Sequence, residues 1–236
     1  MIESKYKMNE SRSNMNEVKF DETNEFILKY FEKEKNGKFL DVGAYDGIKL
    51  SNTYPLWKKG WHGTYIEPSA KIFERLRNNI KERANFYNMA VSNKSGITKF
   101  YDCIEDNGII AVSSINPEHA RSWREGHFAE REKPVKFNEY KTKTTTWNEL
   151  LNSCGTNFNF INIDVEGNNT IVLNQMPFER LDKLSMVCIE KDELDSDIEY
   201  TKIFIKNGFK FEIEINHNMI FSRKNIIFSK QKIKIL

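Results

Sequence analysis

Short apolar runs alternate with amphipathic segments along most of this 236-residue chain, and this alternation constrains the fold more than any other feature. An apolar run of four to eight residues indicates a buried strand, and apolar residues spaced three or four apart indicate a helix. When strands and helices alternate, the strands lie parallel in one sheet with helices on both faces. The sequence therefore predicts an α/β fold with a mostly parallel, doubly wound sheet.

The expected elements follow directly from this pattern. Strands of the sheet are expected at 38–43, 62–68, 85–92, 158–165 and 184–190, and helices at 21–38, 51–60, 69–84, 147–153, 168–176 and 196–208. Ser51 and Ser69 stand at helix starts, where a hydroxyl can accept a hydrogen bond from a backbone N–H. We expect the chain to finish as an antiparallel strand pair, 209–216 and 218–224, with a turn at His217–Asn218.

Residues 104–140 interrupt the alternation, because they are polar and show no regular period. A stretch of this length inside a compact domain is usually functional or mobile. We expect 96–102 to continue a hairpin from 88–92, and 140–146 to form a further strand. Residues 1–20 are polar and are expected to form a tail. The sequence thus predicts one domain over 21–236 with an insertion at about 104–140.

Composition excludes several classes of protein. Lys and Arg total 36 and Asp and Glu 34, a near balance that argues against a dedicated nucleic-acid binder. No run approaches the roughly 20 apolar residues that span a bilayer, and the polar N-terminus lacks a signal-peptide core. The three cysteines are widely spaced without a CxxC pair, which argues against a disulfide framework or a structural zinc site. These features predict a cytoplasmic protein with no membrane partner.

Acidic residues stand at the ends of four predicted strands, namely Asp41, Glu67, Asp164 and Glu190. In an open parallel sheet, ligands bind beyond the carboxyl ends of the strands. We therefore expect these acids to lie around one ligand site.

The segment "DVGAYDG", residues 41–47, differs from a dinucleotide-binding loop. It lacks the middle glycine of G-x-G-x-x-G, and both Asp41 and Asp46 flank the turn. Carboxylates beside a pyrophosphate repel it by ~1 kcal/mol in water and by more when partly buried. S-adenosylmethionine carries an ammonium and a sulfonium and no phosphate, so the loop suits this cationic nucleoside. A tight turn with solvated acids is the alternative.

Glu67 ends the second predicted strand, where an acid in nucleoside-binding sheets accepts hydrogen bonds from ribose hydroxyls. NAD and S-adenosylmethionine share that ribose, so Glu67 does not separate them. A surface glutamate is the alternative for this residue alone.

Several segments, in order, resemble the FkbM family of S-adenosylmethionine-dependent methyltransferases. They are "FLDVGAYDGIKLSNTYPLWKKGWHGTYIEP", "NMAVSNKSGITKFYD", "TKTTTWNELL" and "FINIDVEGNNTIVLNQM", and the resemblance runs from about Phe39 to about Glu190. It implies a class I methyltransferase Rossmann-like fold, usually acting on hydroxyl groups of sugars or natural products. One residue departs from the pattern: the family commonly has Glu two residues after the "DVEG" glycine, and here Asn169 stands there.

The resemblance also implies a set of cofactor-binding residues. Those along the methionine part of S-adenosylmethionine would be Asp41, Gly43, Tyr45 and Gly47, with Ser51 following them, while Glu67 would hold the ribose and Met89, Ala90 and Val91 would border the adenine.

Catalysis is expected at the acids that end the later strands. Adjacent strand ends lie ~5 Å apart, so Asp164 and Glu190 can face one gap. They could bind Mg²⁺ or Mn²⁺, or one of them could act as a general base, or Asp164 could only position the cofactor. His217, in the turn between the last two strands, is a further candidate base. Candidates for contacting the acceptor are His119, Arg121, Trp123, Arg124, His127 and Arg131.

These observations predict an S-adenosylmethionine-dependent methyltransferase that O-methylates a hydroxyl group on a sugar, glycan or small natural product. Three alternatives stay open at this point: a nucleic-acid (RNA) methyltransferase, a non-catalytic nucleoside-binding protein of this fold, and an NAD-dependent oxidoreductase. The oxidoreductase would require the glycine trio that the loop lacks. A homo-oligomer is compatible with the sequence, which does not identify the acceptor.

Overall fold

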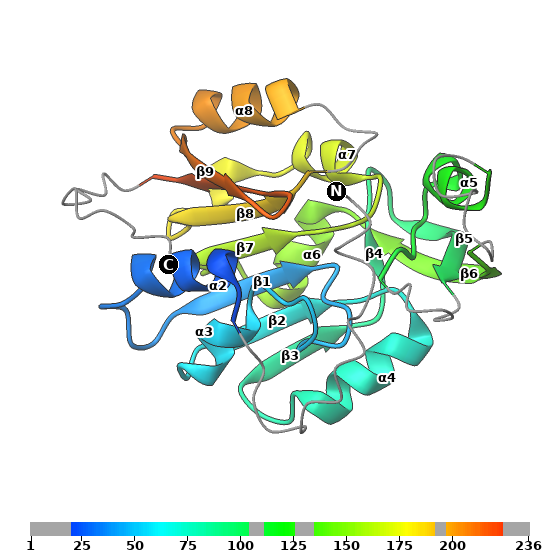
Figure 1. The fold of residues 1–236 in the computed structure, drawn as a ribbon, viewed down its shortest axis with the longest axis horizontal. Coiled ribbons are helices and arrows are strands. Elements are labelled where there is room, and N and C mark those ends of the chain that lie inside the picture. Colours follow the sequence, from blue (N-terminus) through cyan, green and yellow to red (C-terminus); the bar gives the residue numbers. More distant parts are fainter. Residues whose placement is uncertain (1–19, 104–110, 126–134, 192–196, 224–236) are drawn as a thin grey trace.

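A computed structural model of the chain describes residues 20–103, 111–125, 135–191 and 197–223. A seven-stranded sheet forms the centre, and a three-stranded sheet lies beside it (Figure 1). The predicted tail 1–20 lies outside the described residues except for Phe20. In the described part of the chain, no helix combines the length and apolar character needed to cross a bilayer.

The large sheet confirms the predicted fold class. Its strands, in spatial order, are β3 (Ala84–Tyr87), β2 (His62–Ile66), β1 (Lys38–Val42), β7 (Phe160–Ile163), β8 (Met186–Glu190), β10 (Asn218–Ser222) and β9 (Lys210–Ile215). The pairs from β3 to β8 are parallel, and β10 runs antiparallel to both β8 and β9. The chain proceeds from β1 to one side of the sheet and returns at β7 on the other, so the topological switch point lies between β1 and β7.

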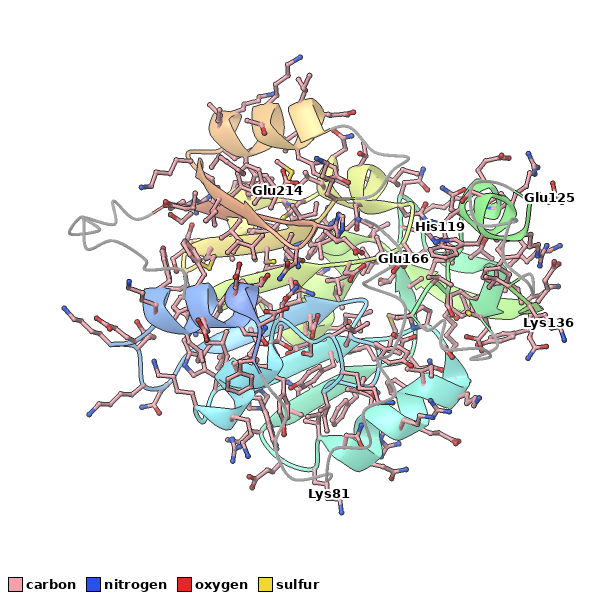
Figure 2. All side chains as sticks on the ribbon, in the orientation of Figure 1. Lys81, His119, Glu125, Lys136, Glu166 and Glu214 are labelled. Atoms are coloured by element: carbon pink, nitrogen blue, oxygen red, sulfur yellow. The ribbon has the colours of Figure 1, made fainter. Side chains whose placement is uncertain are left out.

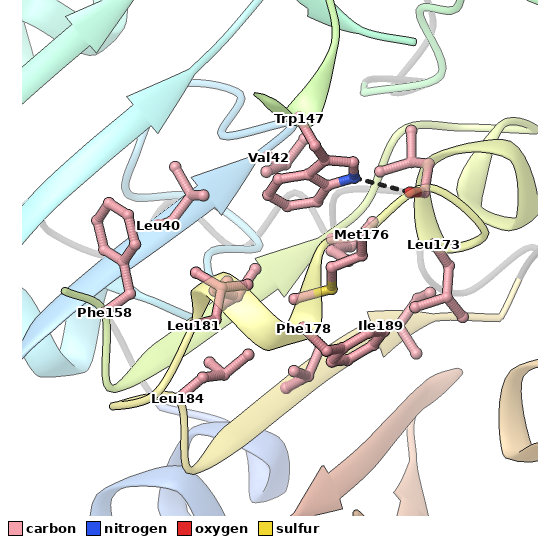
Figure 3. Close-up of a cluster of buried hydrophobic side chains, with 14 of the residues drawn as sticks. Leu40, Val42, Trp147, Phe158, Leu173, Met176, Phe178, Leu181, Leu184 and Ile189 are labelled. Atoms are coloured by element: carbon pink, nitrogen blue, oxygen red, sulfur yellow. Dashed lines mark hydrogen bonds between the residues drawn. The ribbon is translucent and has the colours of Figure 1, made fainter. Parts of the chain in front are cut away.

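Helices cover both faces of this sheet because its strands are apolar on both faces. One core packs beneath α2 (Glu22–Tyr30), α3 (Tyr54–Lys58) and α4 (Ala70–Asn79), and the other beneath α6 (Trp147–Cys154), α7 (Asn169–Leu173) and α8 (Asp197–Lys206), with a short 3₁₀ helix at Phe178–Arg180. In the second core, the Trp147 indole donates a 2.7 Å hydrogen bond to the carbonyl of Val172 (Figure 3).

Helix starts agree with the sequence where a side-chain cap is present. Asp21 and Ser69 accept hydrogen bonds from the backbone N–H groups of Asn24 and Ile72, and so begin α2 and α4. Ser51 does not begin a helix, since α3 starts at Tyr54 with Thr53 as its N-cap. The Ser51 hydroxyl instead accepts bonds from the N–H groups of Thr53 and Tyr54 in the turn before the helix.

Several further boundaries are shorter or shifted relative to the expectation. The helices expected over 21–38, 51–60 and 69–84 cover only Glu22–Tyr30, Tyr54–Lys58 and Ala70–Asn79. The helix expected over 168–176 covers only Asn169–Leu173. The turn between the last two strands is formed by Asn216 and His217, with φ of 49° and 69°, one residue earlier than expected.

The expected hairpin between 88–92 and 96–102 is wrong. In the small sheet, β6 (Phe137–Thr145) lies between β4 (Ala90–Val91) and β5 (Gly96–Cys103). The expected strand 85–92 is also divided, since β3 belongs to the large sheet and β4 to the small one. Asn88, at the division, donates from its side-chain amide to the carbonyls of Glu67 and Pro68, which holds the chain where it leaves the large sheet.

The insertion at 104–140 contains regular structure that the sequence did not indicate. Helix α5 (Pro117–Glu125) begins with proline, whose missing N–H is not needed at a first helical position. Its Trp123 packs with Val112 and Val135 in a small separate core. Strand β6 begins inside the insertion, at Phe137.

Candidate active site

A cavity lies at the carboxyl ends of the parallel strands, beside the switch point between β1 and β7. Nine of the residues proposed from the sequence line it: Asp41, Gly43, Tyr45, Ser51, Glu67, Met89, Ala90, Val91 and Asp164. The remaining three, Gly47, Glu190 and His217, are not among the residues that line it. Most of the residues predicted from the ends of parallel strands therefore lie around one cavity.

The glycine loop passes very close to the end of β7. Gly43 has φ of 88°, and a Cβ placed on it would lie 1.7 Å from the carbonyl oxygen of Asp164. The N–H groups of Gly43 and Ala44 both donate to the carbonyl of Ile66 at 3.0 Å, which ties the loop to β2. Only glycine permits this approach of two backbones.

The second glycine and the second acid of the loop support it from within. A Cβ on Gly47 would lie 2.6 Å from Cδ1 of Leu76, so Gly47 allows the loop to pack on α4. The Asp46 carboxylate accepts hydrogen bonds from the N–H groups of Ile48 and Lys49. Asp46 therefore stabilises the turn that it was expected to flank, and unlike Asp41 it is not among the residues that line the cavity.

Glu67 connects the glycine loop to the start of α4. Its two carboxylate oxygens accept hydrogen bonds from the backbone N–H of Tyr45 at 3.0 Å and of Ser69 at 2.7 Å. Burial raises the pKa of Glu67 to about 8, Asp102 and Asp41 add to the rise, and the two backbone hydrogen bonds oppose it. Each oxygen keeps a lone pair for a hydroxyl donor in the cavity.

Asp41 lies at the floor of the cavity and is held by two side chains. It accepts hydrogen bonds from the Thr53 hydroxyl at 2.6 Å and from the Asn162 amide at 2.9 Å. Burial raises the pKa of Asp41 to about 7, against the effect of these two donors. The Asn52 amide in turn donates to the side-chain oxygens of Asn162 and Asn218, at 3.0 Å each. This buried network joins β1, β7 and β10 beneath the cavity.

Three acids meet where β7 and β8 end. Carboxylate oxygens of Asp164, Glu166 and Glu190 lie within 4.8 Å of one another. The expectation that Asp164 and Glu190 share one gap is therefore confirmed as geometry. Oxygen ligands of this kind suit Mg²⁺ or Mn²⁺. They equally suit a carboxylate that acts as a general base.

Asn169, the residue that departs from the family pattern, connects the two strand ends. Its side-chain oxygen accepts from the N–H of Val165, and its amide donates to the carbonyl of Glu190, both at 3.0 Å. An amide can both accept and donate, whereas an ionised carboxylate only accepts. Asn169 therefore holds together the turn of Asp164 and the end of β8.

His217 and the predicted acceptor residues are placed differently from one another. The carbonyl of His217 accepts a 2.7 Å hydrogen bond from the N–H of Lys191, so the turn lies at the end of β8 where the acids gather.

Arg121 pairs with Glu118 on the exposed face of α5. Arg124 pairs with Glu139 and lies over the ring of Phe137. Trp123 is buried, and His127 and Arg131 lie outside the described residues.

Sequence comparison decides the family. The model of the "Methyltransferase FkbM domain" matches residues 41–212. The chain belongs to the FkbM methyltransferase family. It is therefore an S-adenosylmethionine-dependent methyltransferase, as the resemblance implied. The comparison with curated proteins gives no significant match.

Several solved structures resemble this FkbM methyltransferase in overall arrangement. One is the precorrin-6y C5,15-methyltransferase of Geobacter metallireducens, with 9% identity over 89% of this chain and 90% of that chain and a TM-score of 0.44. Another is the fibrillarin pre-rRNA processing protein of Methanococcus jannaschii, with 13% identity over 91% and 85% and a TM-score of 0.45. A third is an RNA methyltransferase of Salinibacter ruber in complex with S-adenosyl-L-homocysteine, with 10% identity over 91% and 100% and a TM-score of 0.41.

The FkbM domain has a cavity wall that sequence reasoning did not find. Phe100 of β5 and four residues of the following segment, Ala111, Ser113, Ser114 and Ile115, line the cavity together with Glu166 and Asn168 of the turn after β7. Glu166 was visible in the "DVEG" motif, where it follows the strand-end acid by two residues. Phe100 carries no such signal, because only the pairing of β5 with β6 brings it to the site. Ser114 carries none either, because it reaches the site through its bridge to Tyr101 and its hydrogen bond to the Glu166 carbonyl.

Proposed function

We propose that this FkbM methyltransferase transfers a methyl group from S-adenosylmethionine to a hydroxyl group of a sugar, glycan or small natural product. The observation that carries the proposal is the pair of buried acids, Asp41 and Glu67, which line one cavity with raised pKa values. In their ionised forms these acids attract a cation and hydroxyl donors and repel a pyrophosphate.

The residues present fit the cofactor along its whole length. Glu67 would accept hydrogen bonds from the ribose hydroxyls, and the loop from Gly43 to Tyr45 would lie along the methionine part. Asp41 would provide negative charge for the cationic end. Met89, Ala90 and Val91 would border the adenine, and Phe100 lines the same cavity. When bound, the cofactor would supply a methyl group on a sulfonium, and the acceptor oxygen would bond to the methyl carbon in line while the carbon–sulfur bond breaks and S-adenosylhomocysteine leaves.

The acids at the ends of β7 and β8 support this acceptor class. Asp164 and Glu166 line the cavity, and Glu190 lies beside them. Acids at this place disfavour a phosphate-rich acceptor by ~1 kcal/mol for each close pair in water and by more when buried. A neutral hydroxyl compound suits them better than RNA does. Binding to RNA that weakens steeply with added salt would instead favour the nucleic-acid alternative.

One of these acids can also accept the proton that the acceptor hydroxyl loses. We propose that Asp164 or Glu190 takes this proton, with His217 as the further candidate at the same end of the sheet. Alignment of oxygen, methyl carbon and sulfur supplies the other part of catalysis, of order 7–11 kcal/mol in favourable model systems.

A divalent cation is the alternative for the acid cluster. Asp164 and Glu190 would hold Mg²⁺ or Mn²⁺, which would lower the pKa of an acceptor hydroxyl. We expect methyl transfer to stop in excess EDTA and to return with added Mg²⁺ or Mn²⁺ if the acids serve as ligands. Full activity in the chelator would leave the acids as bases and exclude the cation.

Removing the Glu67 side chain tests the cofactor site. We expect Glu67→Ala to weaken binding of S-adenosylhomocysteine by about ten- to a hundredfold, because hydrogen bonds to a charged group contribute about 1.5–3 kcal/mol. Isothermal titration calorimetry measures the affinity, and circular dichroism checks the fold. Glu74→Ala, an exposed position on α4, is the matched control. Equal affinity of the two variants would remove Glu67 from the site.

The same calorimetry separates the remaining alternatives. Tight binding of NAD with no binding of S-adenosylhomocysteine would favour an oxidoreductase. Cofactor binding without methyl transfer in a screen of glycans, small hydroxyl compounds and RNA would favour a non-catalytic protein. Transfer to a hydroxyl compound in that screen is the result we expect.

A further inference from the structure

The turn after β7 holds a residue in an infrequent backbone conformation. Glu166 has φ of 49° and Gly167 has φ of 79°, so both lie in the left-handed region. A non-glycine residue there costs free energy and persists where surrounding contacts hold it. Here the contacts keep Glu166 buried, with an exposed fraction of 6%, and among the residues that line the cavity.

Residues of the insertion provide these contacts. The Ser114 hydroxyl donates to the carbonyl of Glu166, and the Asn116 amide donates to the carbonyl of Gly167. Helix α5 packs directly on the turn, because a Cβ on Gly167 would lie 2.7 Å from the Cβ of His119. Position 167 therefore needs glycine both for its φ and for this helix.

His119 also contacts the carboxylate of Glu166. Its Nε2 lies 3.4 Å from Oε2 of Glu166, within ion-pair range but longer than a well-formed hydrogen bond (Figure 2). The exposed fraction of His119 is 4%. Burying an imidazole and a carboxylate is costly unless they interact. Glu166 lines the cavity and His119 does not, so any influence of His119 on the site acts through Glu166.

We propose that His119 is a positioning residue that holds the Glu166 carboxylate toward the methyl group of the cofactor. The insertion would thus complete the site through helix α5. This inference rests on the proposed function, because it requires S-adenosylmethionine in the cavity with its sulfonium near the acids.

A pair of cofactor analogues tests the proposal without an acceptor. In sinefungin a carbon bearing an amino group replaces the methylated sulfur of S-adenosylmethionine, whereas S-adenosylhomocysteine has an uncharged sulfur there. The ratio of their dissociation constants therefore measures how strongly the carboxylates attract a positive charge at the position of the methyl group. We expect the unsubstituted protein to prefer sinefungin, and Glu166→Gln to reduce this preference about fivefold or more, the effect of one charge at about 4 Å in water.

Matched substitutions at His119 separate positioning from packing. His119→Asn provides a side-chain N–H donor, but the side chain is too short for this donor to reach the position of Nε2. We expect this variant to lose the preference for sinefungin, as Glu166→Gln does. His119→Gln places an N–H at about the reach of Nε2, and we expect it to keep the preference. Trp123→Phe alters α5 packing at a ring 6.3 Å from the His119 ring, and we expect it to keep the preference too. S-adenosylhomocysteine affinity should change less than twofold throughout.

Each outcome bears on one claim. A His119→Asn protein that melts earlier but keeps the preference, while Glu166→Gln loses it, would make His119 a packing residue and overturn the proposal. An unchanged preference in Glu166→Gln would overturn the placement of Glu166. If the unsubstituted protein binds neither analogue, the proposed cofactor site itself fails.

A measurement on the unsubstituted protein covers the case in which His119→Asn does not fold. The imidazole resonances of His119 should differ between the sinefungin and S-adenosylhomocysteine complexes, because the added ammonium would act on its partner carboxylate. Identical His119 resonances in the two complexes would contradict the proposal.

Discussion

At the scale of single residues, Gly43 is where the two halves of the cavity come closest. We expect Gly43→Ala to abolish binding of S-adenosylhomocysteine and to destabilise the fold, because a methyl group would overlap the carbonyl oxygen of Asp164. Gly155→Ala is a matched control, since Gly155 has φ of 84° and nothing within 4 Å of an added Cβ. It should show only the conformational cost of about 1–3 kcal/mol. Thermal unfolding measures the change in stability, and calorimetry measures the change in affinity. Equal changes in the two variants would contradict the predicted overlap with the Asp164 carbonyl oxygen.

Residues differ in how far the sequence could place them. Asp41, Glu67 and Asp164 could be assigned because each ends an apolar run, and parallel strand ends meet at one edge of the sheet. Asn162 and His119 could not. Asn162 interrupts an apolar strand without a periodic signal, and its partners lie in β1 and in the loop before α3. The Glu166 partner of His119 is 47 residues away along the chain and meets it only through packing of α5.

At the scale of elements, strands with long apolar runs were predictable and the insertion was not. β1, β2, β7 and β8 agree with the sequence because each is a buried run followed by a turn signal. Helix α5 was missed because its buried face is only His119, Ala120 and Trp123 among charged neighbours. The separation of β4 from β3 depends on the side-chain bonds of Asn88, which no local propensity encodes.

The link between the ends of β7 and β8 gives a prediction at this scale. We expect Asn169→Asp to reduce the free energy of unfolding by about 1–3 kcal/mol, because it removes the donor to the Glu190 carbonyl and adds a buried charge near the acids. Asn152→Asp, at an exposed position that accepts from Arg180, is the control for charge alone. Chemical denaturation measures the difference. Comparable stability of the two variants would show that the link contributes little.

At the scale of the whole molecule, the two sheets enclose the cavity between them. The small sheet reaches the start of α4, where the Thr142 hydroxyl donates to the carbonyl of Pro68 and the N–H of Ala70 donates to the Tyr140 hydroxyl. Tyr140 in turn donates to Asp102, whose charge adds to the raised pKa of Glu67. Enclosure by both sheets thus keeps water from the acids and sets their protonation.

This enclosure makes binding depend on pH. The pKa values of Asp41 and Glu67, about 7 and about 8, lie above their ordinary values of 3.8 and 4.5. Their contribution to folding is therefore fully present below about pH 4, and it is lost as pH rises through about 7 to 8. A cationic ligand favours the ionised forms, so its binding should release protons in that window and offset the lost stability.

We therefore expect the affinity for S-adenosylmethionine to rise between about pH 6 and pH 8, by up to about tenfold per pH unit for each proton released. Calorimetry in buffers of different ionisation enthalpy counts the protons released. The increase in melting temperature on binding should also be larger near pH 8 than near pH 6. Glu67→Gln should release fewer protons, because one of the two titrating groups is absent. Binding without proton release in the unsubstituted protein would mean that the acids are already ionised before the ligand arrives, and that burial between the sheets does not control their charge.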